Sequence, residues 1–78
     1  MDHLVEIERL SAAIEASPED MALYAERGKI YFRAHDLGRA LDDFNQVLLR
    51  DAENVEIMQY VDMINEILAY RNTDIYNP

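Results

Sequence analysis

The chain has 78 residues, half of them hydrophobic, and its 16 acidic residues against seven basic ones give a formal net charge of −9. This length allows one small domain, which cannot enclose a large cofactor together with a substrate. The acidic balance disfavours nucleic acid and anionic membrane surfaces as partners, and the absence of cysteine excludes disulfide frameworks, cysteine-based zinc sites and thiol nucleophiles. No signal peptide opens the sequence and no apolar run is long enough to span a membrane, so we expect a cytoplasmic protein.

Scarce glycine and proline, two of each, together with long apolar periods, predict helices and no strands. The first helix is expected from about His3 to Ala16 with Asp2 as its cap, and its inward face comprises Leu4, Ile7, Leu10, Ala13 and Ile14. A second helix is expected to reach about Ala34. Its start signal is the segment Ser17-Pro18-Glu19-Asp20, in which Ser17 caps the helix and Pro18 occupies the first helical position.

A third helix is predicted from about Leu37 to Arg50, with Asp36 as its cap. Its inward face comprises Leu37, Ala40, Leu41, Phe44, Val47 and Leu48. The fourth and longest helix is predicted from about Ala52 to Arg71, with Asp51 as its cap. The connections are short, so consecutive helices should pack antiparallel. We therefore expect a helical domain over residues 1–71 and a C-terminal tail over residues 72–78.

An internal repeat emerges when the sequence is shifted by 34 residues. The caps and the core positions both recur: Asp2 falls on Asp36, Ile7 on Leu41, Leu10 on Phe44, Ala13 on Val47, Ile14 on Leu48, Glu19 on Glu53, Leu23 on Ile57, Tyr24 on Met58 and Ile30 on Ile64. Two helices in a period of this length are typical of the tetratricopeptide repeat.

Individual residues extend this resemblance over residues 21–54, which are similar to one complete tetratricopeptide repeat. The signature positions are Tyr24, Gly28, Tyr31, Ala40 and Phe44. The departures are Arg27 where leucine is usual, His35 where the turn often has glycine, and Ala52 where proline is usual. Residues 1–20 resemble the second helix of a preceding repeat, and Val55 onward resembles the first helix of a following one.

The resemblance implies four antiparallel helices stacked as a minimal right-handed solenoid. Physically, Gly28 and Ala40 are small where two helices approach, and Tyr24, Tyr31 and Phe44 fill the space around them. In the family, the first helices of each pair line a concave groove that binds peptides. The positions implied for that groove are Ala25, Lys29, Phe32 and Arg33 from the second helix and Glu56, Gln59, Tyr60, Met63 and Ile67 from the fourth.

Two interpretations of the second-helix face stay open. Lys29 and Arg33 beside Phe32 share a helical face and suit a ligand that offers a carboxylate and an apolar side chain together. The plainer interpretation is a solvated basic edge with Phe32 packed beneath it. The basic and asparagine side chains with which some family members hold a terminal carboxylate are not all present, so we do not predict that ligand class.

The fourth helix carries more apolar residues than one buried face requires. Three accounts stay open. The tail folds back so that Ile75 and Tyr76 cover the surplus, two copies form a homodimer through this helix, or the helix is a docking surface for another protein.

Catalysis has little support in the sequence. His3 with Glu6 offers only two ligands, Ser11 and Ser17 have no evident base, and the neighbouring Asp42 and Asp43 diverge on a helix and reflect the acidic composition. We therefore expect no catalytic residues, no metal and no cofactor.

The predicted function is a non-catalytic interaction module or scaffold that binds a protein or peptide partner and can self-associate. The alternative is an acidic regulator or polyanion mimic that occupies a basic protein surface. Salt separates the two, because binding through net charge weakens steeply with ionic strength.

Overall fold

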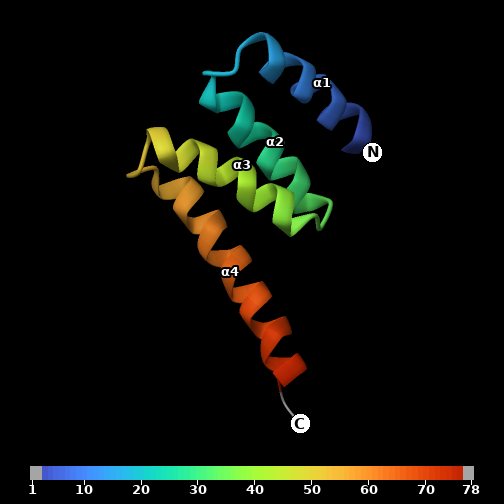
Figure 1. Ribbon diagram of the computed structural model, residues 1–78, viewed down its shortest axis with the longest axis vertical. Helices are drawn as coiled ribbons and strands as arrows, with labels where there is room; N and C mark the ends of the chain where they lie inside the picture. The colour runs from blue at the N-terminus through green and yellow to red at the C-terminus, as the bar shows by residue number, and fades with distance from the viewer. Residues whose placement is uncertain (1–2, 77–78) are drawn as a thin grey trace.

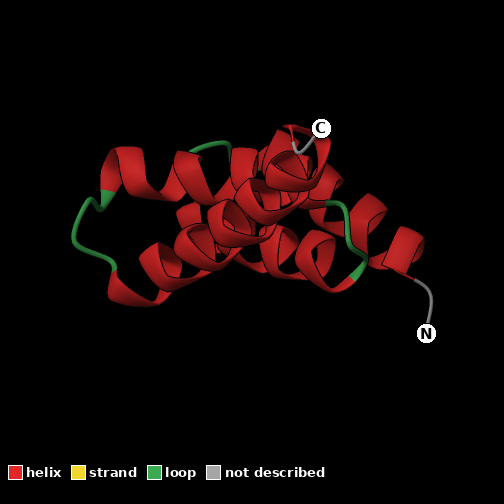
Figure 2. Ribbon diagram, turned by 90° about the horizontal axis from the view of Figure 1, so that it is seen from below, coloured by secondary structure: helices red, strands yellow, loops and turns green. Residues whose placement is uncertain are grey.

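Four α-helices make up the part of the chain that the computed structural model describes, which is the backbone of residues 3–76 and the side chains of residues 3–71. They are α1 (His3–Ala16), α2 (Met21–Arg33), α3 (Leu37–Arg50) and α4 (Val55–Tyr76). Successive helices reverse direction, and each packs on its neighbours along the chain (Figure 1). Short loops join the helices, and no strand occurs between residues 3 and 76 (Figure 2). The prediction of an all-α chain of four helices with packed neighbours is confirmed.

The start of α2 differs from the prediction. The N–H of Ser17 donates to the carbonyl of Ala13 at 2.9 Å, so Ser17 closes α1 rather than capping α2. Asp20 is the cap, because its backbone is extended and its carboxylate accepts a hydrogen bond from the N–H of Ala22 at 3.1 Å. Pro18 consequently lies in the turn before α2, and its predicted place at the first helical position was wrong.

The start of α3 is as predicted. The carboxylate of Asp36 accepts hydrogen bonds from the backbone N–H of Arg39 at 3.4 Å and from its guanidinium at 2.8 Å. The residue before this cap, His35, has a φ of 64°. That left-handed conformation has no steric cost for glycine but a small one for histidine.

The start of α4 also falls later than predicted, at Val55 rather than Ala52. The N–H of Asp51 donates to a carbonyl of α3, so Asp51 closes the preceding helix. Asn54 caps α4, since its Oδ1 accepts from the N–H of Ile57 at 3.1 Å. In both loops the polar residue nearest the helix is the cap.

Helix α4 ends at Tyr76, which is later than the predicted end at Arg71. Because residues 72–76 continue the helix, they do not fold back over α4 as the tail account requires. The side chains of Ile75 and Tyr76 lie outside the described residues, as does the predicted cap Asp2.

The core is centred on α3, and all six of its predicted inward residues are buried or half-buried. Ala40 and Phe44 are fully buried, and around them cluster Leu37, Val47, Ile57 and Ile64. A Cβ atom built on Gly28 would lie only 2.7 Å from a ring carbon of Phe44, so glycine is required where α2 crosses α3. The expected close approach at Gly28 is confirmed.

Helix α1 packs mainly on α2. It buries Leu10 and Ile14, whereas Leu4, predicted to face inward, is 62% exposed. One neighbouring helix covers only a narrow stripe, and Leu4 lies about a quarter turn from the stripe that contains Leu10 and Ile14.

Candidate functional site

The predicted groove residues of α2 and α4 meet in an aromatic and ionic contact. The Lys29 ammonium lies 3.1 Å from Glu56 Oε2 and 6.0 Å from the centre of the Tyr60 ring. The Phe32 ring contacts Tyr60 edge-on, with centroids 5.3 Å apart. Tyr60 in turn stacks on Phe44 at 4.9 Å, which links this surface to the core.

These contacts change what the α2 face offers to a ligand. Lys29 already faces the carboxylate of Glu56, so its charge is partly compensated within the chain. Ala25 and Phe32 pack against the core cluster. This arrangement agrees with the plainer interpretation, in which Phe32 lies beneath a basic edge.

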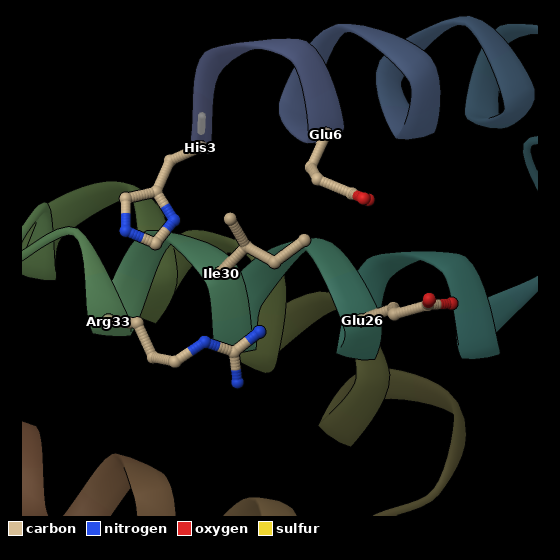
Figure 3. A pocket seen from close by; sticks show the side chains of 5 residues that line it. All are labelled: His3, Glu6, Glu26, Ile30 and Arg33. Atoms are coloured by element: carbon tan, nitrogen blue, oxygen red, sulfur yellow. The ribbon is translucent and has the colours of Figure 1, made fainter. Parts of the chain in front are cut away.

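Arg33 contributes to a second feature, a pocket against α1. It lines a pocket of about 210 Å³ between α1 and α2, together with His3, Glu6, Glu26 and Ile30 (Figure 3). Glu6 also accepts a hydrogen bond from Arg9 at 2.8 Å. The pocket thus combines two carboxylates, a guanidinium and an imidazole on an apolar floor. Among the residues that the structure describes, no group of three or more histidine, aspartate and glutamate side chains is placed to hold a metal ion.

The remaining groove residues lie on α4, whose C-terminal end projects beyond the other helices (Figure 1). Gln59 is exposed. Met63 is 43% exposed, Ile67 37% and Tyr70 73%. An open hollow of about 570 Å³ is lined by Glu66, Ile67, Tyr70 and Arg71. Met63 follows Tyr60 by three residues, so this exposed apolar surface adjoins the paired contacts around Tyr60.

A buried ion pair between α2 and α3 was not predicted. Arg27 donates from Nε and Nη2 to the two carboxylate oxygens of Asp43, each at 2.8 Å. Its Nη1 donates to Ser11 Oγ at 2.9 Å, so one guanidinium joins three helices. Tyr24 and Tyr31 lie beside it, with ring centres 5.8 and 5.7 Å away. The hydrogen bonds to Asp43 raise the pKa of Arg27, which therefore stays charged.

A signal for this pair was present in the sequence. Arg27 and Asp43 immediately precede Gly28 and Phe44, the two residues at the helix crossing. Residues adjacent to a crossing point on two packed helices lie close to each other, so an arginine and an aspartate there are placed to pair. Attributing Asp43 to the acidic composition was wrong, because it is 4% exposed and bonded through both oxygens.

Within the described residues, no helix is long and apolar enough to cross a membrane. No family model, no curated protein and no solved structure matches the chain.

Proposed function

We propose that the chain is a non-catalytic interaction module of the tetratricopeptide-repeat type, which binds a protein or peptide partner along α2 and α4. Under this proposal α2 and α3 form one complete repeat, and α1 and α4 are half repeats on either side. The four helices then form a minimal right-handed solenoid.

The two turns that precede α2 and α4 support the repeat. They lie 34 residues apart and share two backbone hydrogen bonds. Ser17 and Asp51 each donate to the carbonyl four residues earlier, at 2.9 and 2.8 Å, and they accept from Asp20 and Asn54, at 3.1 and 3.2 Å. The 34-residue spacing of two turns that share these bonds is what two copies of one repeat unit would have.

The observation that carries the binding proposal is the exposed apolar stripe of α4, formed by Met63, Ile67 and Tyr70. A terminal helix of a repeat array needs a polar outer face if it is to remain unpartnered. Contiguous apolar side chains on such a helix favour contact with another molecule.

A photo-crosslinking amino acid in the host cell tests the proposal. Placed at Gln59, which is exposed beside the stripe, it should give one discrete protein adduct. Placed at Asn45, which is exposed on α3, it should give none. Equal adducts from both positions, or none from Gln59, would refute a partner surface on α4.

Two alternatives lead to different measurements. An acidic regulator that occupies a basic surface would yield an adduct whose formation collapses at high ionic strength, whatever the position of the crosslinker. A homodimer through α4 would double the mass in solution, which light scattering measures directly.

A further inference from the structure

We propose that the exposed stripe of α4 binds a basic amphipathic helix of a partner protein. This inference rests on the proposed function and names the chemistry of the partner at the same site.

The geometry of the stripe favours a helical partner. Met63, Ile67 and Tyr70 follow one face of α4 over about two turns, a length of about 10 Å. Side chains of a second helix at three-and-four spacing can interdigitate with such a row. An extended peptide would find no strand edge among residues 3–76 to receive its backbone hydrogen bonds, whereas a helix satisfies its own.

The charge around the stripe favours lysine and arginine on the partner. Glu56 and Glu66 stand along the same side of α4, and the Glu56 side chain is 63% exposed although it pairs with Lys29. Arg71, at the far end, is the one basic residue that α4 contributes among those described. The whole chain carries a formal charge of −9, which attracts a cationic partner over a distance of about a Debye length.

The same observations disfavour a second copy as the occupant. Another copy brings the same charge of −9 to the interface. The stripe offers three partly exposed apolar side chains, whereas a stable protein interface buries about 800 Å² on each partner. The negative charge of the chain attracts a basic helix and repels a second copy.

Synthetic peptides of about 16 residues provide the test. The first is an amphipathic helix of leucine and lysine, the second has the same composition in an order with no apolar face, and the third replaces lysine with glutamate. Binding to the full chain is followed by peptide fluorescence anisotropy at physiological ionic strength and by amide chemical shifts of the labelled protein. The first peptide should bind at least about fivefold more tightly than the second, with shifts centred on residues 59–71, and the third should not bind.

Matched variants locate the contact. Tyr70→Ser should weaken binding of the first peptide about fivefold. Leu49→Ser should leave it unchanged, because Leu49 is equally exposed, at 77%, but lies on α3. Glu66→Lys should weaken binding more than Glu15→Lys, an exposed position on α1, although both change the net charge equally. Helical circular dichroism of each variant confirms that it folds.

Several results would overturn the inference. If the scrambled peptide bound equally well, the binding would be explained by net charge alone and no helical apolar face would be needed. If the glutamate peptide bound, the preference for a basic partner would be wrong. Shifts centred between α1 and α2 would place the site elsewhere. A dimer that Tyr70→Ser converts to monomers would make a second copy the occupant. A crosslinked partner at Gln59 without binding of the first peptide would refute this inference and leave the proposed function standing.

Discussion

Replacing Gly28 with alanine should destabilise the chain, although alanine is the better helix former. In the interior of a helix, alanine is favoured over glycine by about 1 kcal/mol. Here the added methyl group would lie 2.7 and 2.9 Å from two ring carbons of Phe44 and 3.2 Å from the Cβ of Asp43. Phe44 is fully buried and stacks on Tyr60, so its ring cannot move aside without disturbing the core. Such overpacking costs about 1–3 kcal/mol, and a fully buried ring that cannot yield places the cost at the upper end of this range. We expect a net loss of about 1–2 kcal/mol.

Gly38 supplies the matched control. It also lies in a helix, but a Cβ built on it meets nothing within 4 Å. Gly38→Ala should therefore raise stability by up to about 1 kcal/mol. Urea unfolding followed by helical circular dichroism measures both variants, and the melting temperatures should move in opposite directions by about 4–8 °C per kcal/mol. A Gly28→Ala chain as stable as the natural one would refute the close crossing of α2 and α3.

Three further predictions concern Phe44 and the turn before α3. Phe44→Ala should unfold the chain, because losing a fully buried ring costs about 3–5 kcal/mol, as much as a small domain's stability; a cooperative melt near the natural temperature would contradict this. His35→Gly should raise the melting temperature by a few degrees, since it relieves a φ of 64° at an exposed residue, worth about 0.5–1 kcal/mol; an unchanged or lower temperature would argue against strain there. Hydrogen bonds from Arg39 hold the pKa of Asp36 below its ordinary range. The resulting stability is present above the pKa of the unfolded chain and is lost as the pH falls through the lowered pKa of the folded chain. Asp36→Asn keeps a good cap, so the natural chain should have the higher urea midpoint near neutral pH and lose that advantage as the pH falls through the lowered pKa of Asp36. A difference that stays constant through the titration of Asp36 would contradict the assignment.

Helix α3 was predictable at both ends because its sequence contains one capping candidate and a full apolar stripe. Helices α2 and α4 were placed too early because each is preceded by two candidates three residues apart, Ser17 and Asp20 or Asp51 and Asn54. The chain needs the first of each pair to close the preceding helix and reverse direction. Only the second residue of each pair, Asp20 or Asn54, can then accept a hydrogen bond from the free N–H groups at the start of the next helix.

The candidate site was predictable as a face but not as a set of contacts. Helical spacing alone places Lys29, Phe32 and Arg33 on one side of α2. It does not say that Glu56 comes within 3.1 Å of Lys29, or that Arg33 lines the pocket beside α1. Those outcomes depend on how α1 and α4 sit against α2, which follows from packing across the whole core.

The restraints on the four helices are uneven, and this bears on where a partner can bind. Arg27 joins α1, α2 and α3 through Ser11 and Asp43, and its side chain is 20% exposed, so removing one partner costs less than the about 3–5 kcal/mol of a fully buried ion pair. Helix α4 is held instead by apolar contacts, through Ile57, Tyr60, Ile64 and Leu68.

Because α4 is one unbroken helix, these contacts also fix the direction of its exposed face. The stripe of Met63, Ile67 and Tyr70 is therefore held in direction by the buried face of α4 while its own surface stays accessible. A partner helix that packs on it needs no opening of the α1–α3 unit, so the cost of binding falls on ordering the partner and a few side chains. Substitutions at Arg27 should consequently lower the stability of the chain without altering the partner affinity of the molecules that remain folded. Substitutions at Tyr70 should weaken partner binding and leave the stability of the chain unchanged.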